Sequence, residues 1–202
     1  MEEVTALHLV IYMKYTDDQL LTRVETNARG FEGWKPGCYD IWVRETDPNA
    51  PFDQFNDKVY TFFCEKYGVR PKFIMVCTGT SIAGSFGLFK FRTYNPLGCA
   101  VLQSDRIVYW SHEEGLHKGK PAYVEVRGFP YYRDGNMNKR AEEIGQVYTD
   151  VIRANCHRAG KHSTIIYNWS VACLVRNDEA EFLKWFNWMN GRPLNVCILK
   201  RF

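Results

Sequence analysis

The chain has 202 residues, of which 46% are hydrophobic and 15% aromatic, and its formal net charge is +3. This length suits one domain with its own core, and the aromatic content excludes an intrinsically disordered chain. The near balance of charge, without a run of Lys and Arg interleaved with aromatic residues, argues against a nucleic-acid-binding protein. No apolar run approaches the length of a membrane span, so we expect a single domain over residues 1–202.

Residues 1–30 are expected to form an N-terminal extension made of a strand and a helix. The short apolar stretch at 6–13 predicts the strand, and the acidic residues around it argue against a secretory signal peptide. The helix is expected at 16–30, with Thr16 as its N-cap, acidic residues in its first turn and Gly30 after its end.

The middle of the chain predicts short strands separated by turns. β-branched and aromatic residues are enriched in six segments, and the breaks between them contain Pro, Gly, Asn and Asp. We expect strands at 38–45, 57–67, 72–79, 97–103, 106–112 and 121–132.

A second helix is expected at 177–191, followed by a last strand at 194–202. Asn177 can cap this helix, acidic residues fill its first turn, and Gly191 ends it. Its apolar positions recur with helical spacing at Phe182, Trp185, Phe186 and Met189. The whole pattern predicts a mostly β fold decorated by an N-terminal and a C-terminal helix.

The seven cysteines are expected to be reduced thiols. Their number is odd, their spacing is wide, and no CxxC pair occurs, so neither a disulfide scaffold nor a zinc knuckle is predicted. His117, His157 and Cys173 include no short-spaced ligand pair, so we expect no metal site and no cofactor. The cysteines are Cys38, Cys64, Cys77, Cys99, Cys156, Cys173 and Cys197.

One cysteine, Cys173, is a candidate nucleophile. A cysteine attacks a carbonyl carbon as the thiolate, so it needs a base close by and donors for the developing oxyanion. His157 lies sixteen residues upstream, a distance that suits two adjacent strands. The small residues before Cys173 would let the backbone approach a substrate. The alternative interpretation is a buried thiol packed on Trp169.

The two motifs, "NCHRAG" at 155–160 and "NWSVACLV" at 168–175, resemble the signature of L,D-transpeptidase-like catalytic domains. In that family a His-containing strand precedes a Ser-x-Gly-Cys turn. The chain is more similar to a subgroup found in phage and bacterial peptidoglycan-processing proteins. Further ordered similarities are "FNDKVYTF" at 55–62, "CTGTSIAG" at 77–84, "GLHKGKPAYVEV" at 115–126 and "YYRDGN" at 131–136.

The resemblance implies a β-sandwich or open barrel of the L,D-transpeptidase type and assigns roles to individual residues. Cys173 would be the acylated nucleophile and His157 its base. Ser170 would support the turn, and the backbone N–H groups of Ala172 and Cys173 would form the oxyanion hole. The expected substrate-binding residues are His117 and Lys118, which match a His-Lys pair on the cleft wall, together with Trp169 and Arg158.

Three positions depart from the family pattern. Ala172 replaces the glycine before the cysteine, and an alanine would strain the turn if that position requires a positive φ. Val175 stands where an arginine is usual, and Arg176 follows one residue later. Arg158 follows the histidine where many relatives have glycine.

The function that the resemblance implies is acyl transfer on peptidoglycan stem peptides through a Cys173 thioester. Hydrolysis of the thioester would make the protein an L,D-peptidase, and attack by an amine would make it a cross-linking L,D-transpeptidase. We favour hydrolysis, as in a phage endolysin, because no export signal is recognised and the subgroup includes phage proteins. The protein is then expected to be made in the cytoplasm and to act on the cell wall after release or within a virion.

Two other functions remain open at this point. One is a non-catalytic cell-wall-binding or virion module that retains the fold, an interpretation that Ala172 favours. The other is a cysteine peptidase that acts on proteins. No particular oligomeric state is predicted.

Overall fold

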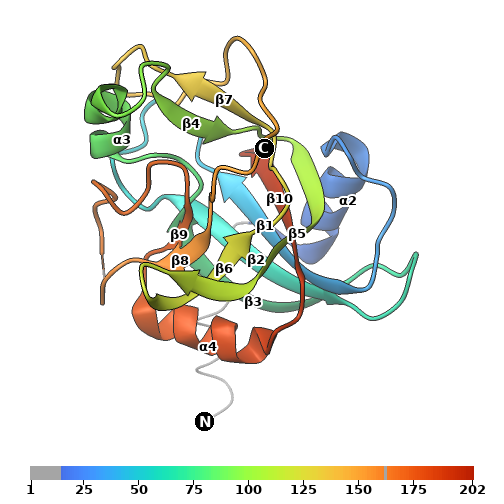
Figure 1. Ribbon diagram of the computed structural model, residues 1–202. Coiled ribbons are helices and arrows are strands. Elements are labelled where there is room, and N and C mark those ends of the chain that lie inside the picture. Colours follow the sequence, from blue (N-terminus) through green and yellow to red (C-terminus); the bar gives the residue numbers. More distant parts are fainter. Residues whose placement is uncertain (1–14, 162) are drawn as a thin grey trace.

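The computed structural model describes residues 15–161 and 163–202, so the strand expected at 6–13 lies outside the described residues. The protein is mostly β, as predicted, and its strands surround a common interior (Figure 1). The helices are α2 (Asp17–Asn27), α3 (Ser85–Lys90) and α4 (Glu179–Met189), with a 3₁₀ turn at Phe91–Thr93. The strands are β1 (Gly37–Arg44), β2 (Asp57–Cys64), β3 (Lys72–Thr80), β4 (Cys99–Leu102), β5 (Arg106–His117), β6 (Lys120–Glu125), β7 (Tyr131–Asp134), β8 (Cys156–Arg158), β9 (Leu174–Arg176) and β10 (Leu194–Lys200).

Eight of these strands form a closed barrel in the order β1-β10-β5-β6-β8-β9-β3-β2, whereas a sandwich or an open barrel was expected. β1 pairs with β10, and β8 with β9, in the parallel direction, and the other neighbours are antiparallel. Closure depends on β8 and β9, because they connect β6 to β3. Each has only three residues, too few for a clear period-2 pattern in the sequence.

The segment 121–132 was expected to be one strand, and this prediction is wrong. It divides into β6, within the barrel, and β7, which pairs with β4 in a separate two-stranded sheet. Gly128 and Pro130 stand at the break, where the backbone of Gly128 lies so close to Thr149 that no side chain would fit. The short helix α3 was not predicted either.

The strands β1, β2 and β10 are buried on both faces, whereas β3, β5 and β6 are partly exposed. On β1, Tyr39, Ile41 and Val43 belong to an outer cluster with α2, whereas Cys38 and Trp42 belong to the interior cluster. This alternation follows from the period of two residues in a strand. Burial on both faces explains why apolar and aromatic residues occupy consecutive positions in β1, β2 and β10.

Helix α2 begins as predicted. The Thr16 side chain accepts a hydrogen bond from the Gln19 N–H, and the Gln19 side chain accepts one from the Thr16 N–H, which forms a capping box. Leu20, Leu21 and Val24 are buried against the outer face of the barrel. The helix ends at Asn27, before the predicted stop.

Helix α4 packs its apolar face on the interior cluster, and it contacts β8 and β9 (Figure 1). Its N-cap is Asp178, whose carboxylate accepts a hydrogen bond from the Glu181 N–H, and not Asn177 as expected. Its predicted end is confirmed, since Asn190 adopts a left-handed conformation before Gly191. No helix among the described residues has the length and apolar character that crossing a membrane requires.

A buried ion pair lies inside the barrel. The guanidinium of Arg176 on β9 is 2.6 Å from the carboxylate of Asp40 on β1, and both side chains are at most 1% exposed. Asp40 also accepts a hydrogen bond from the Thr61 hydroxyl, and the Arg176 guanidinium stacks over the Trp185 ring at 4.2 Å. Because water does not reach this pair, each charge depends on the other.

We expect Arg176→Leu to lower the free energy of unfolding by about 3–5 kcal/mol, because it leaves the Asp40 carboxylate buried without its partner. Urea denaturation followed by tryptophan fluorescence measures this change. The double variant with Asp40→Leu should recover part of the loss. Arg70→Ala, which removes two ion pairs on the surface, is the matched control and should have a much smaller effect. An Arg176→Leu protein as stable as the wild type would contradict the expectation.

Candidate active site

The parallel pair β8 and β9 positions the two residues of the predicted dyad. His157 pairs with Val175, and Cys173 precedes β9 directly. Successive residues of a strand point to opposite faces, so His157 and Cys173 lie on the outer face of the barrel. Cys156 and Arg176 belong to the buried interior instead.

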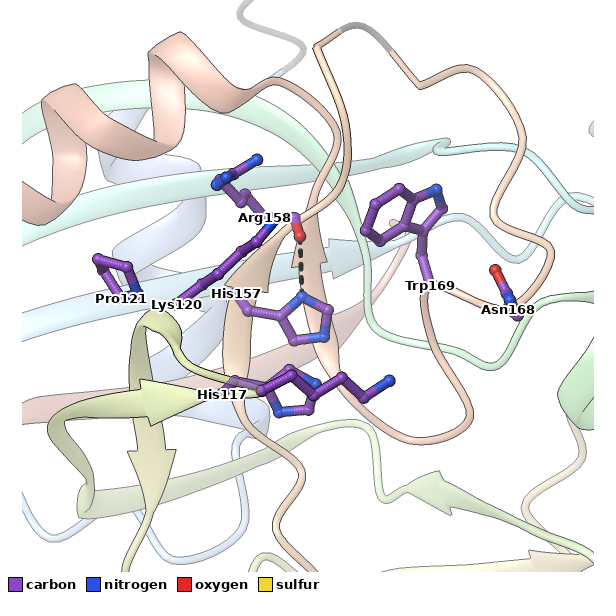
Figure 2. A pocket seen from close by; sticks show the side chains of 8 residues that line it. His117, Lys120, Pro121, His157, Arg158, Asn168 and Trp169 are labelled. Atoms are coloured by element: carbon purple, nitrogen blue, oxygen red, sulfur yellow. Dashed lines mark hydrogen bonds between the residues drawn. The ribbon is translucent and has the colours of Figure 1, made fainter.

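A third element, the hairpin of β5 and β6, brings His117 to the same place. β6 pairs with β8, and the hairpin turn at Lys118 and Gly119 has positive φ at both residues, as expected of a tight two-residue turn. The imidazole rings of His117 and His157 are stacked, with centroids 4.3 Å apart and planes 4° apart (Figure 2).

The structure confirms the predicted proximity of the histidine and the cysteine. A ring nitrogen of His117, a ring nitrogen of His157 and the sulfur of Cys173 all lie within 4.8 Å of one another. This separation suits a direct contact or one through a single water, with the looseness usual in a site without substrate. All seven cysteines are free thiols, as expected.

The hydrogen bonds of His157 define its protonation state. Nδ1 is 2.9 Å from the Arg158 carbonyl oxygen, which can only accept, so Nδ1 carries the proton (Figure 2). Nε2 therefore presents a lone pair, and it is buried without a hydrogen-bond partner among the described residues. Burial lowers the pKa of His157 to about 4, so the ring is neutral at pH 7. A neutral imidazole with a free Nε2 is a base ready to accept a proton.

Cys173 is a buried, protonated thiol at rest. Its side chain is 7% exposed, and burial raises its pKa to about 11, although the Asn155 backbone N–H acts in the opposite direction. The sulfur lies 3.8 Å from the Arg153 carbonyl oxygen, which is a weak contact. The resting site therefore contains a neutral thiol beside a neutral imidazole, and not a thiolate–imidazolium pair.

The turn before Cys173 keeps an unstrained conformation although Ala172 replaces the glycine of the family pattern. The hydroxyl of Ser170 is fully buried and donates a 2.8 Å hydrogen bond to the Cys173 carbonyl oxygen. The Ser170 carbonyl oxygen accepts from the Gly84 N–H at 3.0 Å, which ties the turn to the start of α3. Ala172 does not have a positive φ, so alanine causes no left-handed strain here.

A small pocket of about 130 Å³ opens beside the stacked rings (Figure 2). All four predicted substrate-binding residues line it, and Trp169 is 40% exposed there. The guanidinium of Arg158 also forms a 2.8 Å ion pair with Glu179 of α4, which fixes this wall. The complete lining is His117, Lys118, Lys120, Pro121, His157, Arg158, Asn168 and Trp169.

Positive charge at the pocket comes from Lys118, Lys120 and Arg158. Arg176, the closest match to the arginine of the family pattern, contributes none, because it is paired with Asp40 in the barrel interior. Because Arg158 is paired with Glu179, the charge directed at a ligand comes from Lys118 and Lys120, and it favours a ligand that carries a carboxylate or another anionic group.

Asn155 is a further residue of the site that the sequence did not single out. Its side chain is buried, and its amide nitrogen is 3.0 Å from Nδ1 of His117. The sequence could have indicated Asn155, because residues 155 and 157 point to the same side when the chain is extended. Lys120, Pro121 and Asn168 were likewise not predicted to line the pocket.

The same cluster offers ligand atoms for a soft divalent metal ion such as Zn²⁺, which imidazole nitrogen and thiolate sulfur bind. His157 fits this role well, because its Nδ1–H is held by a carbonyl oxygen. His117 fits poorly, because Asn155 donates to its Nδ1 and leaves a proton on Nε2. A metal ion would require His117 to exchange its proton between the two nitrogens.

Comparisons of the chain with protein-family models, with curated proteins and with solved structures found no match.

We expect Cys173 to be alkylated by iodoacetamide faster than the other six cysteines at pH 7.5, because its sulfur lies beside the neutral imidazole of His157, which can accept the thiol proton. Cys77 is the internal control, since burial raises its pKa to about 11 as well and its side chain is also buried. Mass spectrometry of the digested protein gives the rate for each thiol. His157→Gln should slow the labelling of Cys173 about tenfold or more and leave Cys77 unchanged. Equal rates for the two thiols would contradict a functional dyad.

Proposed function

We propose that the protein is a cysteine-dependent acyl-transfer enzyme that acts on peptidoglycan stem peptides, with Cys173 as nucleophile and His157 as base. The observation that supports the proposal most directly is the free lone pair of His157 Nε2, fixed by the Nδ1–H bond to the Arg158 carbonyl oxygen beside the Cys173 thiol. A buried nitrogen without a hydrogen-bond partner lowers the stability of the fold, so its presence calls for an explanation. A role in catalysis is one such explanation.

The first half of the proposed reaction forms a thioester. The thiol proton of Cys173 passes to Nε2 of His157 as the sulfur attacks the peptide carbonyl carbon. The new C–S bond forms while the carbonyl π electrons move to oxygen, and backbone N–H groups of the turn at Ala172 and Cys173 are the proposed donors to that oxygen. The intermediate then collapses, the C–N bond breaks, and the leaving amine takes the proton from His157.

The second half resolves the thioester. Water or an acceptor amine gives a proton to His157 and attacks the thioester carbonyl, and the C–S bond breaks. The sulfur recovers its proton from His157, which returns both groups to the neutral resting state. With water the enzyme is an L,D-peptidase, which we favour, and with an amine it is an L,D-transpeptidase.

The substrate class is supported by the resemblance of the two motifs and by the charge of the pocket. Stem peptides of peptidoglycan carry free carboxylates, and Lys118, Lys120 and Arg158 line the pocket. Trp169 offers an exposed apolar face beside these charges. This combination suits a short acidic peptide.

One observation favours a second candidate function, a non-catalytic wall-binding or virion module. Cys173 is 7% exposed and its pKa is about 11, which are properties of an inert structural thiol as well. In that case the pocket would bind the stem peptide without cleaving it. Binding without turnover distinguishes the two functions.

We expect purified protein to convert muropeptides and Cys173→Ala to be inactive, as measured by mass spectrometry of the products. Because the pKa of His157 is about 4 in the folded protein, the base stays unprotonated well below pH 6. The kcat/KM value at pH 5.5 should therefore remain within about twofold of the value at pH 7.5 and decrease only as the pH falls toward 4. An acidic limb centred near pH 6.5 would contradict the buried, neutral histidine. Binding of muropeptides by an inactive wild type would support the second candidate.

We expect Ala172→Gly to leave muropeptide turnover within about tenfold of the wild type, because Ala172 does not need a positive φ and its N–H keeps its place. Loss of one well-placed donor is worth roughly 10²–10³ in rate, so a smaller change indicates an intact oxyanion hole. Gain of activity only in the glycine variant would show that the natural sequence is not an enzyme.

A further inference from the structure

We infer that His117 is a second catalytic histidine, a neutral Nε2–H donor to the oxyanion, and that Asn155 holds it in this tautomer. The inference rests on the proposed acyl transfer and gives His117 a chemical role beyond lining the pocket. It depends on the contacts of three side chains, which fix the positions of two protons.

The first contact fixes the orientation of the Asn155 amide. The backbone N–H of Glu125 is 3.0 Å from Oδ1 of Asn155. A backbone N–H can only donate, so the atom that faces it is the amide oxygen. The amide NH₂ group therefore faces His117.

The second contact fixes the tautomer of His117. Nδ2 of Asn155 is 3.0 Å from Nδ1 of His117, and an amide nitrogen can only donate. Nδ1 of His117 is consequently the acceptor, and the proton of the neutral ring is on Nε2. Burial and the nearby Lys118 lower the pKa of His117, so the ring is neutral at pH 7.

The two stacked rings thus carry their protons on opposite nitrogens. His157 has Nδ1–H and a free Nε2, whereas His117 has an occupied Nδ1 and Nε2–H. One ring accepts a proton, and the other donates a hydrogen bond. Acyl transfer by a thiol needs one group of each kind, a base for the nucleophile and a donor for the oxyanion.

The distances between the two imidazole rings and the Cys173 sulfur suit these two roles, base and oxyanion donor. In the tetrahedral intermediate the oxyanion is bonded to the carbon that is bonded to the sulfur. A donor about 3 Å from that oxygen lies about 4–5 Å from the sulfur. One ring nitrogen of His117, one ring nitrogen of His157 and the sulfur of Cys173 lie within 4.8 Å of one another, and His117 lines the pocket.

Asn155 is held rigidly enough to impose the tautomer. Its side chain is 4% exposed, its N–H donates to the Arg153 carbonyl oxygen at 2.8 Å, and its carbonyl oxygen accepts from the Leu174 N–H at 3.1 Å. The carboxylate of Glu125 holds the preceding loop by accepting from the N–H groups of Ile152 and Ala154. The amide cannot rotate without leaving the buried Glu125 N–H unpaired.

The test compares two reagents that both attack Cys173. Acylation by p-nitrophenyl acetate forms a C–S bond, passes through an oxyanion and releases p-nitrophenolate. Alkylation by iodoacetamide forms a C–S bond with loss of iodide and involves no oxyanion. A donor to the oxyanion therefore affects acylation alone, whereas a general disturbance of the site affects both reactions.

Two variants remove the donor in different ways. His117→Phe keeps a flat ring to stack on His157 but has no N–H. Asn155→Asp has nearly the same shape and still accepts from the Glu125 N–H, but its carboxylate accepts from Nδ1–H of His117 and so reverses the tautomer. We expect each to lower the acylation rate roughly 10²–10³-fold and to leave alkylation near the wild-type rate. His157→Gln, the control, should slow both reactions.

A second readout is independent of activity. The ¹⁵N chemical shifts of His117 should identify the Nε2–H tautomer in the wild type and the Nδ1–H tautomer in Asn155→Asp. Acylation of His117→Phe at the wild-type rate, or an Nδ1–H tautomer in the wild type, would overturn the inference. Alkylation of the wild type without acylation would overturn it too and leave the dyad intact. If the acylation pattern holds but no muropeptide is converted, the substrate class of the proposed function fails and the role of His117 stands.

Discussion

The parallel pairing of β8 with β9 is the constraint on which the barrel and the site both depend. It closes the sheet between β6 and β3, and its register determines which side chains face the interior. A slip of one residue would move Cys173 to the interior and expose Leu174. Arg176, three residues after Cys173, opposes such a slip because its charge is buried against Asp40. An ion pair in the core thereby fixes the place of Cys173, the proposed nucleophile, on the outer face of the barrel.

The chemistry of the site follows from burial. A buried thiol and a buried imidazole both favour their neutral forms, so no thiolate–imidazolium pair forms between them at rest. Such a thiol reacts with oxidants and electrophiles more slowly than a preformed thiolate would, since these reagents react with the thiolate. In the proposed reaction, His157 must therefore take the proton from Cys173 during the attack itself.

Much of the fold could be predicted from periodicity and composition. The helices α2 and α4 and the longer strands of the barrel have clear patterns, as at Phe182, Trp185 and Met189. The strands β8 and β9 have no such pattern because of their length, so the spacing of His157 and Cys173 predicted only that the two lie close together. Closure of the barrel and the division of 121–132 depend on contacts between distant segments, which no local window contains.

The finer properties of the site were beyond the sequence for the same reason. The stacking of His117 on His157 depends on the hairpin of β5 and β6. The tautomer of His117 depends on Asn155, whose orientation is determined by one backbone N–H of Glu125. A proton position of this kind results from three segments that meet only in the folded chain.

The parallel pairing of β1 with β10 has a consequence for how the protein comes to be folded. These are the first and the last strands of the described chain, and they are neighbours in the barrel. Contacts between such distant segments form slowly, because a long loop must close before they contribute any stability. During synthesis the barrel therefore stays open until β10 emerges from the ribosome. The arrangement of Cys173 and His157 that the closed barrel supports is then completed only after both ends of the sheet have met.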